Sequence, residues 1–103
     1  MLCANDRLAL GALKHFETVG LDCPGDISIT GFNDMPFLDM IKPGLTTVRV
    51  QQFRAGAKAA SLLLDIIDGN DDRVPTKTIL PVHLVERQSV AKPRGTVTEK
   101  LVG

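Results

Sequence analysis

The chain has 103 residues, of which 44% are apolar, and its 12 basic and 12 acidic side chains leave no net charge. This length and apolar share suit one small folded domain and argue against a disordered segment. The balanced charge and the presence of only four aromatic residues, all Phe, argue against a surface that grips duplex DNA or stacks single-stranded bases.

The first part of the chain has the pattern of a strand, a helix and a second strand. Residues 1–4 read as an apolar strand already under way, so we expect the chain to be part of a longer protein. Asn5 or Asp6 can cap a helix that ends at Gly20, a position that favours a left-handed residue without a Cβ. The stretch DISITGF (26–32) alternates like a strand, and the short loops indicate a parallel βαβ unit. The apolar residues at helical spacing are Leu8, Ala9, Ala12, Leu13, Phe16 and Val19.

The second part begins with LTTV (45–48), a short β-branched stretch that favours a strand. A second helix is expected from about Gln51 until Gly69-Asn70 stops it. The stretch KTILPVHLVERQ (77–88) is expected to be extended, and its Pro81 suits an edge or a crossing point. Residues 92–103 lack periodicity and are expected to form a loose tail. The apolar and small residues on one face of the second helix are Phe53, Gly56, Ala57, Ala60, Leu63, Leu64 and Ile67.

The sequence holds no pattern typical of catalysis. It contains no G-x-S-x-G, no phosphate-binding G-x-x-x-x-G-K-[ST] and no pair of His at ligand spacing. We expect His15, on the polar side of the first helix, and His83, in the last strand, to be surface residues. Asp34 and Asp39 could form a carboxylate pair, but two acids in a loop are more often solvated or turn-forming. We therefore expect no enzyme, no cofactor and no metal site.

The two cysteines and the lack of a targeting segment bear on location. Cys3 and Cys23 lie in apolar segments without C-x-x-C spacing, so we expect buried free thiols in a reducing compartment. No signal peptide opens the chain, and no apolar run approaches the roughly 20 residues of a membrane span. The expected location is the cytoplasm.

Several short motifs follow one another in order along the chain. They begin with AND (4–6), GL (20–21) and GFND (31–34), continue with LTTV (45–48), and end with LP (80–81) and R-x-S (87–89). Each motif is weak alone, but the ordered set resembles the LacI/GalR family of bacterial transcription regulators over about residues 2–91.

The resemblance implies an α/β fold like that of periplasmic sugar-binding proteins. Such a fold has two parallel-sheet subdomains, a ligand cleft between them and three chain crossings that act as a hinge. The chain would be the C-terminal portion (1–91) of the effector-binding core, with 1–32 and 78–91 in one subdomain and 45–69 in the other. The GFND stretch would be one of the crossings. The expected hinge residues are Phe32, Asp34 and Thr78.

The resemblance also implies an effector site that faces the cleft. Asn5 and Asn33 are the best candidates, because an amide offers both a donor and an acceptor to sugar hydroxyls. Asn5 is equally well explained as a helix cap, whereas for Asn33 a ligand contact is favoured over a turn residue. The family commonly has Asp where this chain has Asn33, so its effector can differ from a simple hexose. Val50 and Gln52 could line the cleft from the other subdomain, although an apolar contact at a strand end explains Val50 better.

A homodimer follows from the same resemblance. Leu10 on the first helix, with Met40 and Ile41 in the loop, would form an apolar patch that a two-fold axis brings onto itself. The alternative is that Met40 and Ile41 are buried under their own loop.

The function implied by the resemblance is that of a transcriptional regulator responsive to a sugar-like effector. Effector binding would favour one orientation of the subdomains and so set the spacing of two DNA-reading domains. These 103 residues hold no helix-turn-helix, so operator DNA would be bound only through an N-terminal domain. The alternative is a sugar-binding protein of the same fold with no role at DNA, which an upstream secretory signal would favour.

Overall fold

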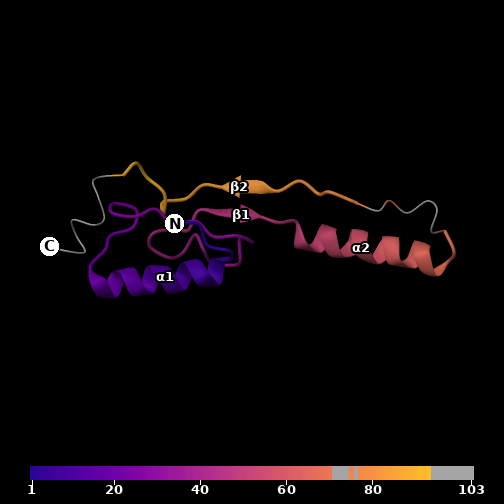
Figure 1. Cartoon of the computed structure of the whole chain (residues 1–103), viewed down its shortest axis with the longest axis horizontal. Coiled ribbons are helices and arrows are strands. Elements are labelled where there is room, and N and C mark those ends of the chain that lie inside the picture. Colours follow the sequence, from indigo (N-terminus) through magenta and orange to yellow (C-terminus); the bar gives the residue numbers. More distant parts are fainter. Residues whose placement is uncertain (71–74, 76, 94–103) are drawn as a thin grey trace. The chain divides into compact units, whose positions relative to one another are not determined.

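The computed structural model describes residues 1–70, 75 and 77–93. Its elements are helix α1 (Asp6–Val19), strand β1 (Thr47–Arg49), helix α2 (Gln52–Ile67) and strand β2 (His83–Val85), in that order (Figure 1). The chain divides into two compact units. Unit 1 comprises Met1–Arg49 and His83–Gly103, and unit 2 comprises Val50–Val82. Within the described ranges, no helix is long and apolar enough to cross a membrane.

Helix α1 begins and ends where the sequence predicts. The Asn5 backbone is extended, and its side-chain Oδ1 accepts a hydrogen bond from the Leu8 amide at 2.9 Å. Gly20 ends the helix with a φ of 79°, in the left-handed region that a residue without a Cβ adopts most readily. The prediction of one buried apolar face is only partly correct. Ala9 is buried, whereas Leu8 and Val19 are exposed.

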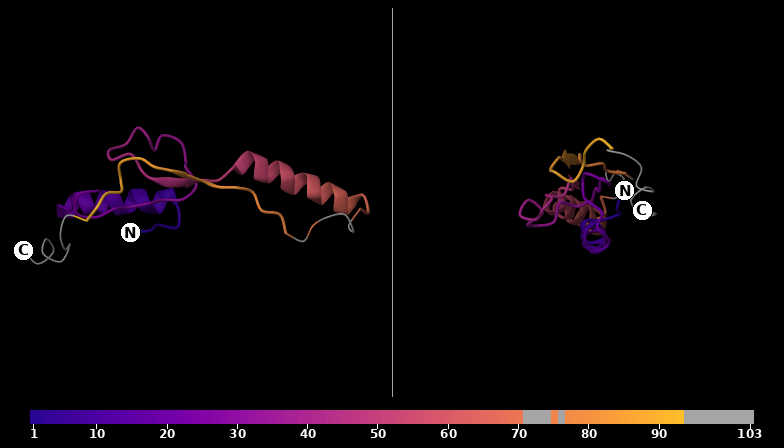
Figure 2. Two further views of the ribbon diagram at one scale, coloured as in Figure 1. Left: turned by 90° about the horizontal axis from the view of Figure 1, so that it is seen from above. Right: turned by 90° about the vertical axis from the view of Figure 1, so that its left-hand side faces the viewer.

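The two named strands form an antiparallel pair. Thr47, Val48 and Arg49 of β1 lie opposite Val85, Leu84 and His83 of β2. The two strands lie side by side in Figure 1, and their segments overlap in the left view of Figure 2. Parallel pairing is limited, among the described residues, to three isolated bridges: Leu2 with Thr30, Thr30 with Thr46, and Asn33 with Arg49. The expected parallel ladder is therefore present as single bridges, and residues 1–4 and 26–32 form extended segments rather than full strands.

The core of unit 1 lies between α1 and the segments around Thr30. Its buried members are Ala9, Ile29, Leu38 and Leu45. Cys3 and Cys23 pack against this core as free thiols, but both are half-buried, so the prediction of full burial was too strong. Cys23 begins the turn at residues 23–26, and its Sγ donates a hydrogen bond to the Ser89 carbonyl oxygen at 3.5 Å.

Unit 2 is built around α2, and no residue of this fully described helix is buried. The helix ends at Ile67 and is followed by its cap residue Asp68 and by Gly69 with a φ of 82°, close to the predicted stop. The predicted apolar face exists, but it is open to solvent: Phe53 is 90% exposed and Ile67 68%.

The boundary between the units differs from the expected one. The sequence assigned 45–69 to the second subdomain and placed crossings at GFND and near Thr78, whereas the chain passes between the units after Arg49 and after Val82. The reason is that Thr46 and Thr47 are hydrogen-bonded to unit 1, Thr46 to Ser89 and Thr47 to Asp6. Of the expected tail, 94–103 lies outside the described residues.

Candidate functional site

The GFND stretch, which carries the two candidate residues Asn33 and Asp34, has an unusual backbone. Asn33 has a φ of 114° and Asp34 a φ of 55°, values that residues with a Cβ rarely adopt. The Asn33 amide donates to the Val48 carbonyl oxygen at 2.9 Å, which fixes the segment beside β1. Residues held in such sparsely populated conformations cluster at functional sites.

The two asparagines expected to bind effector come from neighbouring segments of unit 1. The Asp6 amide, one residue after Asn5, donates to the carbonyl oxygen of Phe32, one residue before Asn33, at 3.2 Å. Both asparagines are half-buried. Asn5 also caps α1, so its Oδ1 is already engaged and its side-chain NH₂ is the group with a donor to offer.

Asp6 connects these segments, a role that sequence reasoning missed. Its side chain is 1% exposed, and its carboxylate accepts from Thr47 Oγ1 at 2.6 Å and from the Met35 amide at 2.7 Å. A Cβ at Gly31 would overlap Asp6 Oδ1 and approach Leu45 Cδ2 to 3.0 Å, so glycine is required there. The available signal was the AND triplet together with two Thr in a strand that is otherwise apolar.

Asp34 binds two arginines from separate parts of unit 1. Its Oδ2 accepts from Arg49 Nε and its Oδ1 from Arg87 Nη2, both at 2.8 Å. Burial of the carboxylate works against its ionisation, but the hydrogen bonds from Arg87 and Arg49 outweigh it and hold the pKa of Asp34 below its usual value. The sequence treated Asp34 as a turn or hinge residue and gave no sign of these ion pairs beyond the R-x-S motif.

The R-x-S motif itself completes a polar framework under the site. Ser89 Oγ donates to the Ile29 carbonyl oxygen at 2.5 Å and accepts from the Thr46 amide at 2.9 Å. Arg87 donates from Nη1 to the Leu45 carbonyl oxygen at 2.8 Å. In the part of the chain that the structure describes, every buried side-chain nitrogen and oxygen has a hydrogen-bond partner, so this framework is fully satisfied.

The remaining candidate effector and hinge residues are distributed over both units. Val50 is half-buried and Gln52 exposed at the start of α2, and both belong to unit 2. Thr78 is an exposed residue of unit 2, whereas Phe32 and Asp34 lie inside unit 1. A shared site for Asn5, Asn33, Val50 and Gln52 stays a prediction. Thr78 lines a hollow of about 420 Å³ in unit 2, together with Ala55, Lys58, Ala59, Leu62, Pro75 and Leu80.

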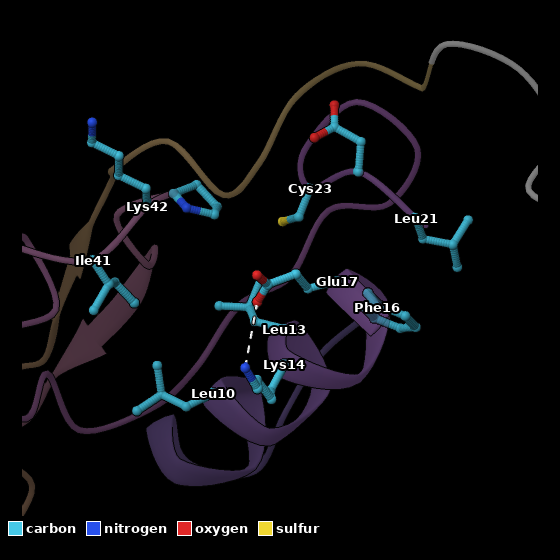
Figure 3. A pocket seen from close by; sticks show the side chains of 11 residues that line it. Leu10, Leu13, Lys14, Phe16, Glu17, Leu21, Cys23, Ile41 and Lys42 are labelled. Atoms are coloured by element: carbon cyan, nitrogen blue, oxygen red, sulfur yellow. Dashed lines mark ion pairs between the residues drawn. The ribbon is translucent and has the colours of Figure 1, made fainter. Parts of the chain in front are cut away.

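Two of the three residues expected at a dimer interface lie together. Leu10 and Ile41 both line an open cavity of about 310 Å³ between α1 and the 41–43 loop (Figure 3). Lys14 and Glu17, paired at 3.9 Å, lie along the helical side of this cavity. Ile41 packs partly against the core, whereas Met40 is 74% exposed. Burial under the loop therefore applies in part to Ile41 and not to Met40.

The two histidines and the other side chains that could bind a metal are dispersed among the described residues. His15 and His83 are both exposed, on α1 and β2 respectively. Over residues 1–70, 75 and 77–93, no three His, Cys, Asp or Glu side chains are grouped so that they could hold a metal ion.

The comparisons of this chain with known sequences and with solved structures agree with one another. The model of the periplasmic binding protein-like domain matches residues 1–90. The lactose operon repressor of Rhizobium radiobacter is 33% identical over 93 residues, which cover 90% of this chain and 80% of that protein. Other curated relatives are longer, and the chain spans only 24–27% of their length.

Two solved structures show the same fold. A LacI family transcriptional regulator from Enterococcus faecium, solved with bound ribose, matches with a TM-score of 0.77 at 36% identity, over 87% of this chain and 33% of that one. The lac repressor dimer, solved with operator and the anti-inducer ONPF, matches with a TM-score of 0.79 at 34% identity, over 87% of this chain and 31% of that one.

Proposed function

The chain belongs to the LacI/GalR family of transcription regulators and has the periplasmic binding protein-like domain of that family, and from this premise we propose that it forms the effector-binding and dimerisation portion of such a regulator. The effector is a sugar or a sugar derivative, and the regulator acts in the cytoplasm as a homodimer that reaches operator DNA through a separate N-terminal domain.

The observation that carries this proposal is the paired placement of Asn5 and Asn33. Both are half-buried amides on adjoining segments of unit 1, and the Asn33 backbone is held at a φ of 114°. Amides pair well with hydroxyl groups, which donate and accept in the same way. The similarity to a regulator that was solved with ribose supports a polyhydroxylated ligand.

Val50 and Gln52 of unit 2 are further effector contacts in this proposal. Val50 and Gln52 come directly after the crossing at Arg49, and the returning crossing precedes His83. We place the hinge at these two crossings and keep Phe32, Asp34 and Thr78 as candidate hinge residues, with Asp34 reaching the outgoing crossing through its ion pair with Arg49. A ligand that favours one orientation of the two units shifts the population of orientations by its difference in affinity between them.

Dimerisation is assigned to the surface formed by Leu10, Met40 and Ile41. Exposed Met40 and the cavity lined by Leu10 and Ile41 give an apolar surface of the kind that a symmetric copy can bury. In a dimer, the orientation of the two units in each copy sets the distance between the two DNA-reading domains.

A chimera tests the proposal directly. Residues 1–90 of this chain replace the matching segment of the Enterococcus faecium regulator, and sugars beginning with ribose are screened by thermal shift and then measured by calorimetry. We expect Asn33→Ala to weaken binding of the best sugar about tenfold, because a ligand hydroxyl loses its buried partner. The matched control is Asn70→Ala, an exposed asparagine beyond the end of α2.

Two outcomes contradict the proposal. One is a folded chimera that binds sugar equally well with and without Asn33→Ala. The other is a folded chimera that sediments as a monomer, with Leu10→Asp and Met40→Asp causing no change relative to the parent.

A further inference from the structure

Asp34 occupies a position that its description as a turn residue does not explain. Its carboxylate is 10% exposed and binds Arg49 and Arg87 through different oxygens. Arg49 is the last residue of unit 1 before the chain passes to unit 2, and it pairs in register with His83, the first residue after the chain returns. Arg87 lies just beyond β2. One carboxylate therefore holds the unit 1 end of the outgoing crossing and the segment that follows the returning strand β2.

The same residue borders a strained backbone. Asn33 and Asp34 both have positive φ, and a non-glycine residue in this region costs free energy that the surroundings must offset. The Asn33 amide is bonded to Val48, and the Asp34 amide donates to Thr47 Oγ1 at 3.3 Å. These two bonds involve residues of the outgoing segment, and the ion pair with Arg49 extends the same attachment by one residue.

The charges around Asp34 explain why its carboxylate is suited to this task. Two guanidinium groups face one carboxylate, and charge-assisted hydrogen bonds are stronger and more directional than neutral ones. Arg87 is itself anchored to the Leu45 carbonyl oxygen, so one side of the arrangement is fixed to the core. Arg49 has no such second bond among the described residues, and its side chain is 55% exposed. We therefore expect the Arg87 side chain to be fixed in place and the Arg49 side chain to be able to change its position.

We propose that Asp34 is a positioning residue that holds Asn33 in its strained conformation and couples that residue to the two chain crossings through Arg49 and Arg87. The inference rests on the proposed effector role of Asn33. A sugar that displaces Asn33 would then act on Arg49, where the outgoing crossing begins, through the neighbouring residue Asp34. Asp34 itself does not touch the ligand.

The alternative is that the ion pairs merely stabilise unit 1 as a whole. The two readings differ in where a variant acts. A positioning role predicts loss of order confined to Asn33 and the crossings, whereas a general stabilising role predicts an equal loss of protection throughout unit 1.

Amide hydrogen exchange of the ¹⁵N-labelled chain, followed by NMR, separates them. The informative quantity is the protection factor of the Asn33 amide relative to those of Ile29, bonded to Ser89, and Leu21, bonded to Phe16. In Asp34→Asn we expect this ratio to fall about tenfold, the effect of losing a hydrogen bond to a charged group. Asp39→Asn, an exposed carboxylate in the same loop, is the matched control and is expected to leave the ratio unchanged.

Arg49→Gln provides the second variant. Its exposed side chain makes it less disruptive, so it decides the matter if Asp34→Asn fails to fold, and we expect a smaller fall in the same ratio. Equal loss of protection at Asn33, Ile29 and Leu21, or no loss at Asn33, overturns the proposal. The measurement needs no sugar, so its failure is distinct from a failure of the chimera with Asn33→Ala.

Discussion

Units 1 and 2 of this chain illustrate two different uses of an amphipathic helix. In unit 1, α1 buries Ala9 against Ile29, Leu38 and Leu45, and the buried carboxylate of Asp6 at its first turn ties it to β1. In unit 2, α2 has an equally regular apolar stripe, yet Phe53, Leu63, Leu64 and Ile67 are exposed.

The difference teaches that apolar periodicity identifies which face of a helix is suited to burial but not whether the chain supplies the partner. Helix stability in proteins comes mostly from tertiary packing of the apolar face. We therefore expect the described part of unit 1 to be held by its own contacts and α2 to be the less stable element. Each substitution below either removes that contrast or makes it larger.

The largest effect is expected for Asp6→Ala. The change removes two short hydrogen bonds to a carboxylate and leaves the Thr47 hydroxyl and the Met35 amide without their acceptor. We expect a loss of about 3–6 kcal/mol in the free energy of unfolding, from two hydrogen bonds to a charged group. Urea unfolding followed by far-ultraviolet circular dichroism measures it, with the exposed neighbour Arg7→Ala as control. A loss equal to that of the control would contradict the framework described for unit 1.

Truncation of a leucine in each unit tests the contrast itself. Leu38 is fully buried and Leu64 is exposed. Leu38→Ala should reduce the free energy of unfolding by about 2–4 kcal/mol because it leaves a cavity, whereas Leu64→Ala should change it by less than about 0.5 kcal/mol. The same urea titration measures both. Comparable losses would mean that α2 is packed in solution.

Two glycines give the next contrast. A Cβ at Gly31 would overlap Asp6, whereas a Cβ at Gly56 in α2 meets nothing within 4 Å. Gly31→Ala is expected to cost about 1–3 kcal/mol as an overpacked site. Gly56→Ala is expected to raise helicity and stability by about 0.5–1 kcal/mol, since alanine is the better helix former. Circular dichroism at 222 nm and urea unfolding check both. A destabilising Gly56→Ala would show that another surface closely approaches α2.

The smallest expected effect is a change in the free energy of unfolding at acidic pH. Because the folded-state pKa of Asp34 is lowered from 3.8, its ionised form contributes stability that is fully present above that value. This contribution is lost as the pH falls through the lower folded-state pKa. Arg49 is largely exposed, so salt weakens its share. Asp34→Asn should flatten the pH dependence of unfolding below about pH 4, and Asp39→Asn should leave it in place. An unchanged acid limb in Asp34→Asn would contradict the ion-pair assignment.

Local structure was predicted from the sequence more accurately than any other feature of the chain. Asn5, Gly20 and Gly69 act locally, so both limits of α1 and the C-terminal end of α2 followed from local chemistry. Gln51, at the start of α2, makes no side-chain cap bond. The family also followed, because the order of short motifs survives even where each motif is weak. The extended segments around Thr30 were predicted as strands, but their length depends on neighbouring strands, which local pattern does not specify.

The network beneath the candidate site was not predicted, because its members are far apart in sequence. Asp34 and Arg87 are separated by 53 positions, and Thr46 and Ser89 by 43. A polar residue inside a strand, such as Thr47, is usually predicted to lie on the surface. Only the fold shows that the Thr47 hydroxyl contacts the buried carboxylate of Asp6. The limits of the two compact units differ from the predicted subdomain limits for the same reason, since the bonds that keep Thr46 and Thr47 in unit 1 are long-range.

The most direct test of the proposed role is the intact mass of the natural protein from its own cells, interpreted together with the sequence of its gene. A regulator of this family should have a mass about three to four times the 11.1 kDa of this chain, in line with the 24–27% that the chain spans of its longer relatives. Its gene should also encode a helix-turn-helix upstream. A secretory signal upstream, or a mature product of 11.1 kDa with no DNA-reading domain, would contradict a role at operator DNA.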